Sequence, residues 1–402
     1  MPIPGFEPLD FRAFHRDVLP GLLEGGRGSM AARAARAHGS LAFRLHSGEA
    51  VTYRPGTGGI EIVAGDDAAD TVMQLGHEAW EGLVYDYESA PGLLYGDRVR
   101  TARGQAMRFV GWEPALRAIY TGRPVYDPAS LDLRGRDGRP LDPERAFVLG
   151  DDLEEMAHFL RTTGYCFVRG VFGANEVARF LADALALRRA ARQGDRLSWW
   201  AKGGGGEEIC CRVTRGGDGP HLATLRGDLR ILGLAALADT PLVAREGEGN
   251  GVTCIYKSPA VREGLSDLPW HRDCGMGGHS LMCPVLVASV FLTAATPETG
   301  ELRFLPGSWS RTCSFAEADD ARAPRGVAFR AEPGDVSIHY GDVMHAAPPP
   351  TRSGRSPYRI SATVGFSRPD ARVHIGGRSY NRVLHQREDG QIEHLAKIAE
   401  RS

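Results

Sequence analysis

The sequence lacks several features that would place it in a specialised class of protein. No apolar run approaches the about 20 residues that cross a bilayer. The opening MPIPGFEPLDF has no basic region followed by an apolar stretch, as a signal peptide would have. The formal net charge is -2, so no excess of one sign would attract nucleic acid or an anionic membrane surface. These absences predict a cytoplasmic protein with no nucleic-acid partner and no membrane span.

Cysteine is scarce and irregularly spaced. There are seven, at positions 166, 210, 211, 254, 274, 283 and 313. An odd number without framework spacing predicts reduced thiols, which fits the cytoplasm. The rest of the composition is ordinary for a folded protein, with 42% hydrophobic and 24% charged residues. A chain of 402 residues exceeds one typical core, so two domains are expected.

A polar segment divides the chain. Residues 125–146 are rich in Pro, Gly, Asp and Arg and show no sustained apolar period, which is typical of a linker. The segment separates an expected domain over residues 1–124 from a second over residues 147–402. Both contain helical and strand patterns, so the predicted fold class is α+β.

The first domain alternates helical and strand patterns. A helix is expected from Phe11 to Leu22, shortened or kinked by Pro20. Three short runs separated by turns predict a β-meander. Residues 69–85 are expected to be helical, with Val72, Leu75, Ala79 and Leu83 on one side. A further strand and helix follow. The expected strands lie at 41–45, 50–54, 60–63 and 96–105, and the last helix at 112–120.

This order resembles the sterol carrier protein-2 (SCP2) family over roughly residues 10–122. The segments that support the resemblance are ADTVMQLGHEAWEGLVYD and GDRVRTARGQAMRF. The resemblance implies an α/β sandwich around an apolar tunnel for lipids or acyl chains. A domain used only for assembly would show nearly the same pattern, so lipid binding and a structural role both remain open.

The second domain begins with helices and continues with strands. Residues 151–187 predict a helix, a buried strand, a turn and a second helix. Short apolar strands then alternate with Gly/Pro turns, which indicates a β-sandwich or barrel. These strands are expected at 251–257, 284–294, 301–307, 326–331, 335–340 and 359–366.

The stretch LPWHRDCG (268–275) contains a His-Arg-Asp triplet that two unrelated chemistries use. Protein kinases use such a triplet, but no Asp-Phe-Gly follows here. On a strand, His271 and Asp273 would point to the same side. Two imidazoles and one carboxylate bind a divalent first-row metal and leave open positions. His345 is the expected third ligand, with His339 as the alternative.

The strand RISATVGF offers a second, anion-binding feature. Arg359 and Ser361 share its polar face, and a guanidinium with a neighbouring hydroxyl suits a dicarboxylate. His279, in a Gly-rich loop, is expected to be a solvated or pocket residue.

Three stretches in the same order resemble the phytanoyl-CoA dioxygenase family of Fe(II)/2-oxoglutarate oxygenases. They are YKSPAVREGLSDLPWHRD, TPETGELRFLPGSWSR and EPGDVSIHYGDVMHAAPPPTRSGRSPYRISATVGF. The resemblance implies a double-stranded β-helix (jelly-roll or cupin-like) core with flanking helices. It implies Fe(II) on His271, Asp273 and His345, and the distal carboxylate of 2-oxoglutarate on Arg359, with Lys257 nearby. It also implies that O2 is consumed, that succinate and CO2 are released, and that a hydrophobic small molecule is hydroxylated or otherwise oxidised.

Departures from the family pattern leave some roles open. Ala346-Ala347 stands where the family often has Gly-Ser, so Ser361 is expected to replace that Ser in holding the cosubstrate. The interval from His345 to Arg359 is longer than usual, which leaves Arg352 or Arg355 as alternative carboxylate ligands. Asp273 is present, whereas halogenating relatives replace it, so oxidation is expected.

Two other functions compete with the oxygenase. A non-catalytic lipid-binding or transfer protein with a degenerate oxygenase half is one alternative. A zinc hydrolase is the other, because two His and an Asp also bind zinc. The sequence shows no general base comparable to the Glu of His-Glu-x-x-His beside these residues.

Overall fold

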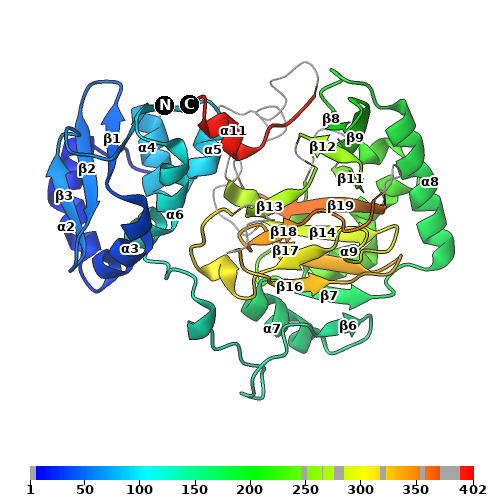
Figure 1. Cartoon of the computed structure of the whole chain (residues 1–402). Helices are drawn as coiled ribbons and strands as arrows, with labels where there is room; N and C mark the ends of the chain where they lie inside the picture. The colour runs from blue at the N-terminus through cyan, green and yellow to red at the C-terminus, as the bar shows by residue number, and fades with distance from the viewer. Residues whose placement is uncertain are drawn as a thin grey trace.

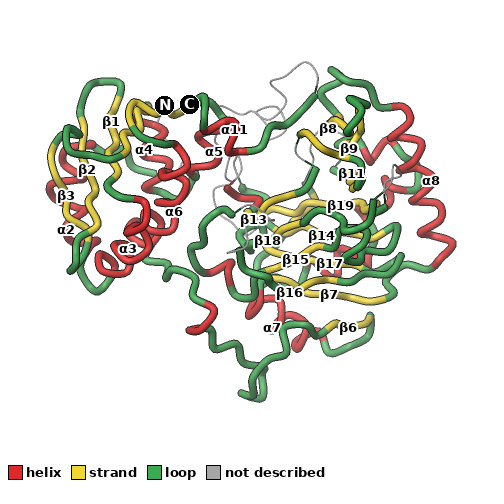
Figure 2. The backbone as a smooth tube through the Cα atoms, in the orientation of Figure 1, coloured by secondary structure: helices red, strands yellow, loops and turns green. Residues whose placement is uncertain are grey.

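The computed structural model describes residues 6–245, 251–264, 266–275, 285–316, 323–353, 358–371 and 390–402. The chain forms two parts that lie side by side (Figure 1). The N-terminal part, residues 6–122, contains a five-stranded sheet, and the C-terminal part, residues 146–371, contains a ten-stranded and a four-stranded sheet. A segment of mostly loop joins them, with one short turn, η3 (Pro128–Ser130) (Figure 2).

The N-terminal sheet has the strand order β3-β2-β1-β4-β5. The first three strands form the expected antiparallel meander, and β4 pairs in parallel with β1. The strands are β1 (Leu41–Leu45), β2 (Ala50–Pro55), β3 (Ile60–Ala64), β4 (Thr71–Leu75) and β5 (Val99–Arg103).

The expectation of one helix over residues 69–85 is wrong in its first half. Residues 71–75 form strand β4, and only α4 (His77–Val84) is helical. The strand is buried on both faces, with Leu75 in the main core and Val72 in a small cluster on the other side. Such a strand is a nearly continuous apolar run, which periodicity alone does not distinguish from a buried helix. Gly76 has extended backbone and separates the two elements.

Helices pack on one face of this sheet. The first helical segment runs as α1 (Phe11–Ala13), the π-turn η1 (Phe14–Val18) and α2 (Leu19–Leu23), followed by α3 (Arg27–Ala35) and η2 (Arg36–His38). Pro20 lies in the first turn of α2, where its missing N–H costs little. Two more helices, α5 (Ala90–Tyr95) and α6 (Ala106–Thr121), complete the layer.

Aromatic side chains fill the space between this sheet and its helices. Trp80, Trp112, Phe43, Phe109 and Tyr53 are fully buried. They meet edge to face, as in the pair Phe43 and Phe109 with ring centroids 5.9 Å apart. The described core is therefore packed with side chains in the layer where the SCP2 resemblance implies a tunnel.

The C-terminal part contains two facing sheets, as the strand pattern predicts. The larger has the order β12-β8-β9-β11-β19-β14-β17-β7-β6, with β10 beside β19, and the smaller has the order β13-β18-β15-β16. The larger comprises β6 (Ala146–Val148), β7 (Tyr165–Arg169), β8 (Ser198–Gly203), β9 (Glu208–Val213), β10 (Val243–Ala244), β11 (Val252–Lys257), β12 (Val261–Glu263), β14 (Leu286–Phe291), β17 (Val336–Tyr340) and β19 (Arg359–Ser367). The smaller comprises β13 (Leu268–His271), β15 (Leu302–Phe304), β16 (Val327–Phe329) and β18 (His345–Ala347).

Helices and short turns flank these sheets. The expected helix–strand–helix at residues 151–187 is present as α7 (Leu153–Thr163), β7 and α8 (Ala174–Ala190). A third helix is α9 (Leu229–Ala235). The remaining short turns are η4 (Gly216–Asp218), η5 (Leu222–Gly227), η6 (Asp273–Gly275) and η7 (Ser308–Ser310).

Aromatic contacts join the two C-terminal sheets at one end. Phe167 of β7 stacks on Phe329 of β16 with centroids 4.2 Å apart, and Phe291 of β14 meets Phe329 at 5.3 Å. Because side chains alternate along a strand, the register fixes the residues that share this inner face. On β19 they include Arg359 and Ser361, since Ser361 lies opposite Phe291. The inner face thus carries polar as well as apolar side chains.

The two parts share a core. Trp199 of β8 packs in the same cluster as Trp80 and the other N-terminal aromatics. Helix α11 (Leu395–Ala399) returns from the far end of the chain and packs on α5 and α6 (Figure 1). Its Leu395 is fully buried in that cluster. We call the cluster that holds Trp199, Leu395 and the N-terminal aromatics the shared core.

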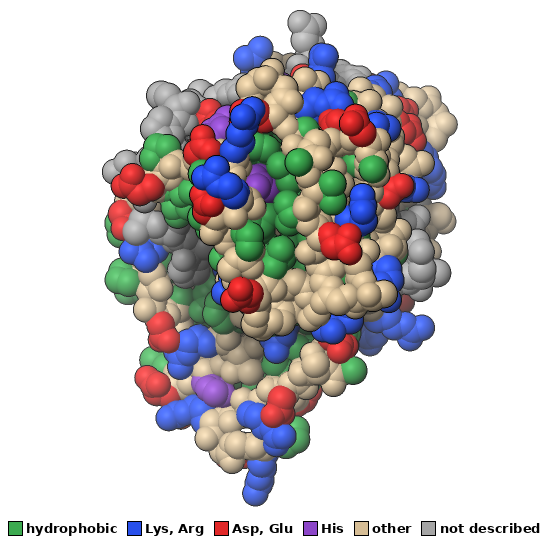
Figure 3. Space-filling view, turned by 90° about the vertical axis from the view of Figure 1, so that its left-hand side faces the viewer, with side chains coloured by type: hydrophobic (Ala, Val, Ile, Leu, Met, Phe, Trp, Pro, Cys, Tyr) green, Lys and Arg blue, Asp and Glu red, His purple; other side chains and the backbone are tan. Residues whose placement is uncertain are grey.

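The outer surface matches the balanced composition. On the N-terminal side, acidic and basic side chains are interspersed, with apolar side chains between them (Figure 3). Within the described residues, no helix is both long and apolar enough to span a membrane.

Candidate metal centre

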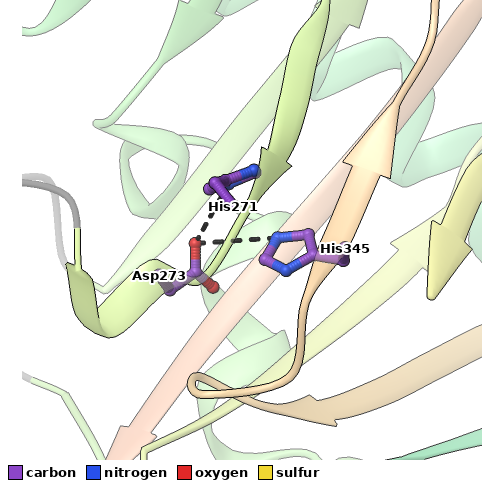
Figure 4. A group of neighbouring side chains, drawn as sticks. All are labelled: His271, Asp273 and His345. Atoms are coloured by element: carbon purple, nitrogen blue, oxygen red, sulfur yellow. Dashed lines mark ion pairs between the residues drawn. The ribbon is translucent and has the colours of Figure 1, made fainter. Parts of the chain in front are cut away.

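Three side chains predicted as metal ligands converge in the structure. His271 ends β13, Asp273 opens the turn η6, and His345 begins β18. β13 and β18 pair, with His271 opposite His345. The nearest potential ligand atoms of the three residues all lie within 4.8 Å of one another (Figure 4).

The route to this convergence differs from the expected one. The expectation that His271 and Asp273 lie together on a strand is wrong, because β13 ends at His271 and the chain turns into η6. Asp273 reaches the two imidazoles by this turn. Strand pairing between β13 and β18 then supplies the second imidazole from the distant His345.

The distances fit a small cation. Asp273 Oδ1 lies 3.8 Å from His271 Nε2 and 3.7 Å from His345 Nε2. Neighbouring ligand atoms bound at about 2.1 Å in an octahedral sphere lie about 3 Å apart. Small side-chain movements would therefore bring all three onto one face of a metal ion.

Hydrogen bonds orient both imidazoles in the same way. The Nδ1 of His271 lies 2.7 Å from the Pro269 carbonyl, and that of His345 lies 3.1 Å from the Val343 carbonyl. A carbonyl only accepts, so each Nδ1 is the protonated nitrogen and donates. Each Nε2 then presents its lone pair toward Asp273, which is the tautomer that a metal requires.

Electrostatics keep these groups in the ligand form. Burial, helped by the neighbouring imidazole of His345, lowers the pKa of His271 to about 4. Burial also lowers the pKa of His345 to about 4. Desolvation alone would raise the pKa of Asp273, but the imidazoles of His345, His339 and His271 outweigh it and lower that pKa. At neutral pH the centre therefore offers two neutral imidazoles and one carboxylate.

His339, the alternative third ligand, lies behind the carboxylate. It is 2% exposed on β17, and its Nε2 is 3.5 Å from Asp273 Oδ2, the oxygen that faces away from the other two histidines. Its Nδ1 has no hydrogen-bond partner within the described structure. Only His271, Asp273 and His345 form the compact ligand group there. This geometry suits a role in orienting Asp273.

Two cationic side chains of the inner face lie on β11 and β19. Lys257 and Arg359 are register partners on these paired strands, and both are buried. Arg359 donates from Nη1 to the Gly300 carbonyl at 2.9 Å, while its buried Nε has no partner in the described residues. A buried, unpaired guanidinium N–H is costly unless an anion occupies it. Ser361 lies two residues along the same face and is 4% exposed.

Lys257 has protein partners of its own. Its Nζ forms an ion pair with Asp267 and donates to the Ala347 carbonyl at 2.7 Å. Burial lowers the pKa of Lys257 to about 8, and the nearby Arg359 adds to this while Asp267 opposes it. Burial also lowers the pKa of Arg359 to about 10. The two cations therefore lie in a site where an added anion would be favoured.

The three arginines considered as partners of the far carboxylate of 2-oxoglutarate differ in their position in the structure. Arg352 is exposed, whereas Arg359 is 4% exposed on the inner face. Arg355 and His279 lie outside the described residues.

Sequence reasoning did not identify Arg212 or Asp267 as site residues. Arg212 of β9 lies over the Trp199 ring at 4.4 Å, and its charge contributes to the low pKa of His271. Strand alternation in EICCRV gave no signal for Arg212, because its position depends on the pairing of β9 with β11. Asp267 precedes the metal motif by four residues and was missed because its partner Lys257 lies on a separate strand.

Residues 160–356 match the family model of phytanoyl-CoA dioxygenase (PhyH). This segment contains Lys257 and all three converging residues, and it ends just before Arg359. No curated protein matches the chain significantly.

Several solved structures are similar to the chain. AviO1 from Streptomyces viridochromogenes Tue57 is 25% identical, with 55% of this chain and 97% of that chain covered and a TM-score of 0.44. SnoN, a non-heme alpha ketoglutarate dependent epimerase from nogalamycin biosynthesis, is 22% identical, with 57% and 86% covered and a TM-score of 0.43. EctD from S. alaskensis, solved with 2-oxoglutarate and 5-hydroxyectoine, is 21% identical, with 61% and 86% covered and a TM-score of 0.41.

The family match and the converging donor set together support an Fe(II)/2-oxoglutarate-dependent oxygenase in the C-terminal part. The match lies within the C-terminal part and does not extend to residues 1–124.

Proposed function

We propose that His271, Asp273 and His345 hold Fe(II), and that Arg359 binds the far carboxylate of 2-oxoglutarate with help from Ser361 and Lys257. The enzyme would oxidise an unactivated C–H bond of a hydrophobic small molecule such as a lipid, acyl thioester, terpenoid or steroid. The observation that supports this most directly is the shared orientation of two buried imidazoles toward one carboxylate oxygen.

When bound, iron and 2-oxoglutarate supply the oxidation itself. In a hydroxylation, the substrate C–H, O2 and 2-oxoglutarate give the alcohol, succinate and CO2, so one oxygen atom enters each organic product. The protein contributes binding and orientation. Arg359 would neutralise the cosubstrate's far carboxylate in a buried site, where a charge-assisted hydrogen bond is strong.

A small cavity beside His271 is lined by the apolar side chains of Pro91, Cys313, Phe315 and Met344 and by the charged side chains of Glu113 and Arg272. Pro91 belongs to α5 of the N-terminal part. The cavity's volume of about 10 Å³ is that of a single water site, which is too small for a substrate. The proposal of an apolar substrate therefore rests on the resemblance of the C-terminal part to the phytanoyl-CoA dioxygenase family.

An anaerobic titration of the metal-free protein with Fe(II) and 2-oxoglutarate tests the proposal. We expect a weak visible charge-transfer band that saturates near one iron per chain. His271→Ala and Asp273→Ala should abolish the band. Arg359→Ala should weaken 2-oxoglutarate binding far more than iron binding. If the native protein develops no band, the non-catalytic alternative is favoured.

Lipid carriage by the N-terminal part is the second candidate, supported by the resemblance of residues 10–122 to the SCP2 family. The helix layer on a five-stranded sheet agrees with it, whereas the aromatic packing leaves little room for a tunnel. Titration of the full chain with a fluorescent fatty acid tests carriage. Saturable binding that survives His271→Ala would support it, and no saturable binding would exclude it.

A further inference from the structure

Arg272 occupies the position between two proposed iron ligands, yet its side chain points away from them. It is 6% exposed and lies at the junction of the two parts. Its Nη1 donates to Asp342 Oδ1 at 2.8 Å, and its Nη2 donates to Glu113 Oε1 at 2.9 Å. Glu113 belongs to α6 of the N-terminal part, 159 residues earlier in the chain. The segment that carries His271 and Asp273 is therefore hydrogen-bonded, through Arg272, to the N-terminal part.

This pair belongs to a larger group of acidic and basic side chains with balanced charge, which is buried except for Arg123. Arg117 of α6 donates to both oxygens of Asp86, at 2.6 and 2.8 Å. Arg123 lies 3.2 Å from Asp342. Asp342 thus receives cations from both sides. We call this group the junction cluster; its three acidic and three basic members are Asp86, Glu113, Arg117, Arg123, Arg272 and Asp342.

The junction cluster reaches all three proposed ligands. Arg272 is bonded in sequence to His271 and Asp273, and Asp342 lies three residues before His345 in the turn from β17 to β18. Glu113 Oε2 also accepts from the Ala90 N–H at 3.0 Å, at the start of α5. Helix α5 in turn contacts η6, which carries Asp273. One carboxylate of the N-terminal part is therefore linked directly to Arg272 and, through α5, to the turn that carries Asp273.

The junction cluster is better suited to fixing the positions of the neighbouring metal ligands than to raising the stability of the fold. Removing charges from water offsets most of the attraction in a buried ion pair, so it is a weak source of stability. The guanidinium fork is directional, however, and holds two carboxylates at fixed angles. Groups that hold metal ligands in place commonly affect metal affinity by 10–100-fold.

Building on the proposed iron site, we propose that the N-terminal part positions the metal centre through Glu113 and Arg272. Glu113 is a positioning residue, because it touches neither the metal nor the substrate in this arrangement. In this role the N-terminal part supports the proposed metal ligands from one side, and the junction cluster and the shared core hold the two parts together.

The test compares Glu113→Ala with a matched variant, Asp66→Ala, in the full chain. Asp66 pairs with Arg44 on the far face of the N-terminal sheet, and the side-chain exposures are 9% for Glu113 and 11% for Asp66. Iron affinity is measured by anaerobic titration in saturating 2-oxoglutarate, and folding by circular dichroism. We expect Glu113→Ala to weaken iron binding at least about tenfold, and Asp66→Ala to leave it unchanged.

A conservative variant and a double variant distinguish a loss of ligand positioning from a loss of folding. Glu113→Gln keeps the size and one acceptor, so we expect it to restore part of the iron affinity; it also replaces the alanine variant if that one does not fold. In an Arg272→Met background, the further change Glu113→Gln should have little added effect, because the partner is already gone. Equal iron affinity in Glu113→Ala and native protein would overturn the inference, as would an equal loss in Asp66→Ala.

The same titration distinguishes this inference from the proposed function. If His271→Ala abolishes iron binding while folded Glu113→Ala binds normally, the positioning role fails and the iron site stands. If His271→Ala itself binds iron like the native protein, the proposed iron site fails and the inference falls with it.

Discussion

At the residue scale, His339 combines an unfavourable environment with a useful position. Its Nδ1 is buried without a partner in the described structure, and its Nε2 lies 3.5 Å from Asp273 Oδ2. We predict that His339→Phe changes the stability of the iron-free protein by less than about 1 kcal/mol, because removing the unsatisfied Nδ1 is offset by losing the contact between Nε2 and Asp273. It should also weaken iron binding about tenfold. Urea unfolding with chelator and iron titration measure the two effects.

The same pair of measurements decides the alternative role of His339. If His339 were a direct iron ligand, the His339→Phe protein would lose iron binding as completely as the His345→Ala protein. If His345→Ala keeps native affinity and His339→Phe loses it, His339 is the third ligand.

Lys257 gives the site a predictable pH dependence. The pKa of its amine is lowered to about 8, so the amine is charged at pH 7 and largely neutral at pH 9. Arg359, with a pKa of about 10, stays charged over most of this range. We predict that 2-oxoglutarate binding weakens about tenfold from pH 7 to 9, roughly the 1.4 kcal/mol of one charge-assisted contact. Calorimetric titration should show weak, nearly pH-independent binding in Lys257→Met; a pH-independent native enzyme would contradict the assignment.

At the scale of elements, the turn that ends at Gly300 supports both cations. Gly300 has φ +85°, and a Cβ there would collide with the Lys257 side chain. Its carbonyl accepts the Arg359 hydrogen bond. We predict that Gly300→Ala costs about 1–2 kcal/mol of stability from the left-handed backbone. It should also weaken 2-oxoglutarate binding by displacing Lys257. Gly48→Ala, with φ +95° and open space around it, is the control that should lose stability alone.

The local pattern of apolar and polar residues was sufficient to predict most helices and strands of the C-terminal part. The sequence predicted His271, Asp273 and His345 as one donor set, and the three converge, but Asp273 arrives by the turn η6 and not on a strand as its spacing predicted. The pattern failed at residues 71–75, where a strand buried on both faces mimics a helical period. The local pattern did not predict the contact of Glu113 with Arg272, because periodicity within a segment carries no information on residues 159 positions apart. Such contacts depend on how two separately formed layers meet.

At the scale of the whole molecule, the shared core should make the two parts unfold together. Loss of the N-terminal layer would expose Trp199 and Leu395 and break the junction cluster. We predict a single denaturant transition, with tryptophan fluorescence and circular dichroism coinciding. Leu395→Ala should lower the midpoint of the whole transition, at a cost of about 2–5 kcal/mol. Two separated transitions would show that the parts are energetically independent.

The return of α11 to the N-terminal part also constrains the order of events during synthesis. Domains generally fold as units from the N-terminus as the chain is made. Here Ile392, Leu395 and Ala399 complete a core whose other members are mostly made first. The N-terminal part emerges from the ribosome with an uncovered apolar patch on α5 and α6, which persists until the oxygenase strands have been translated. A nascent chain stalled before residue 390 would thus be a natural substrate for chaperones.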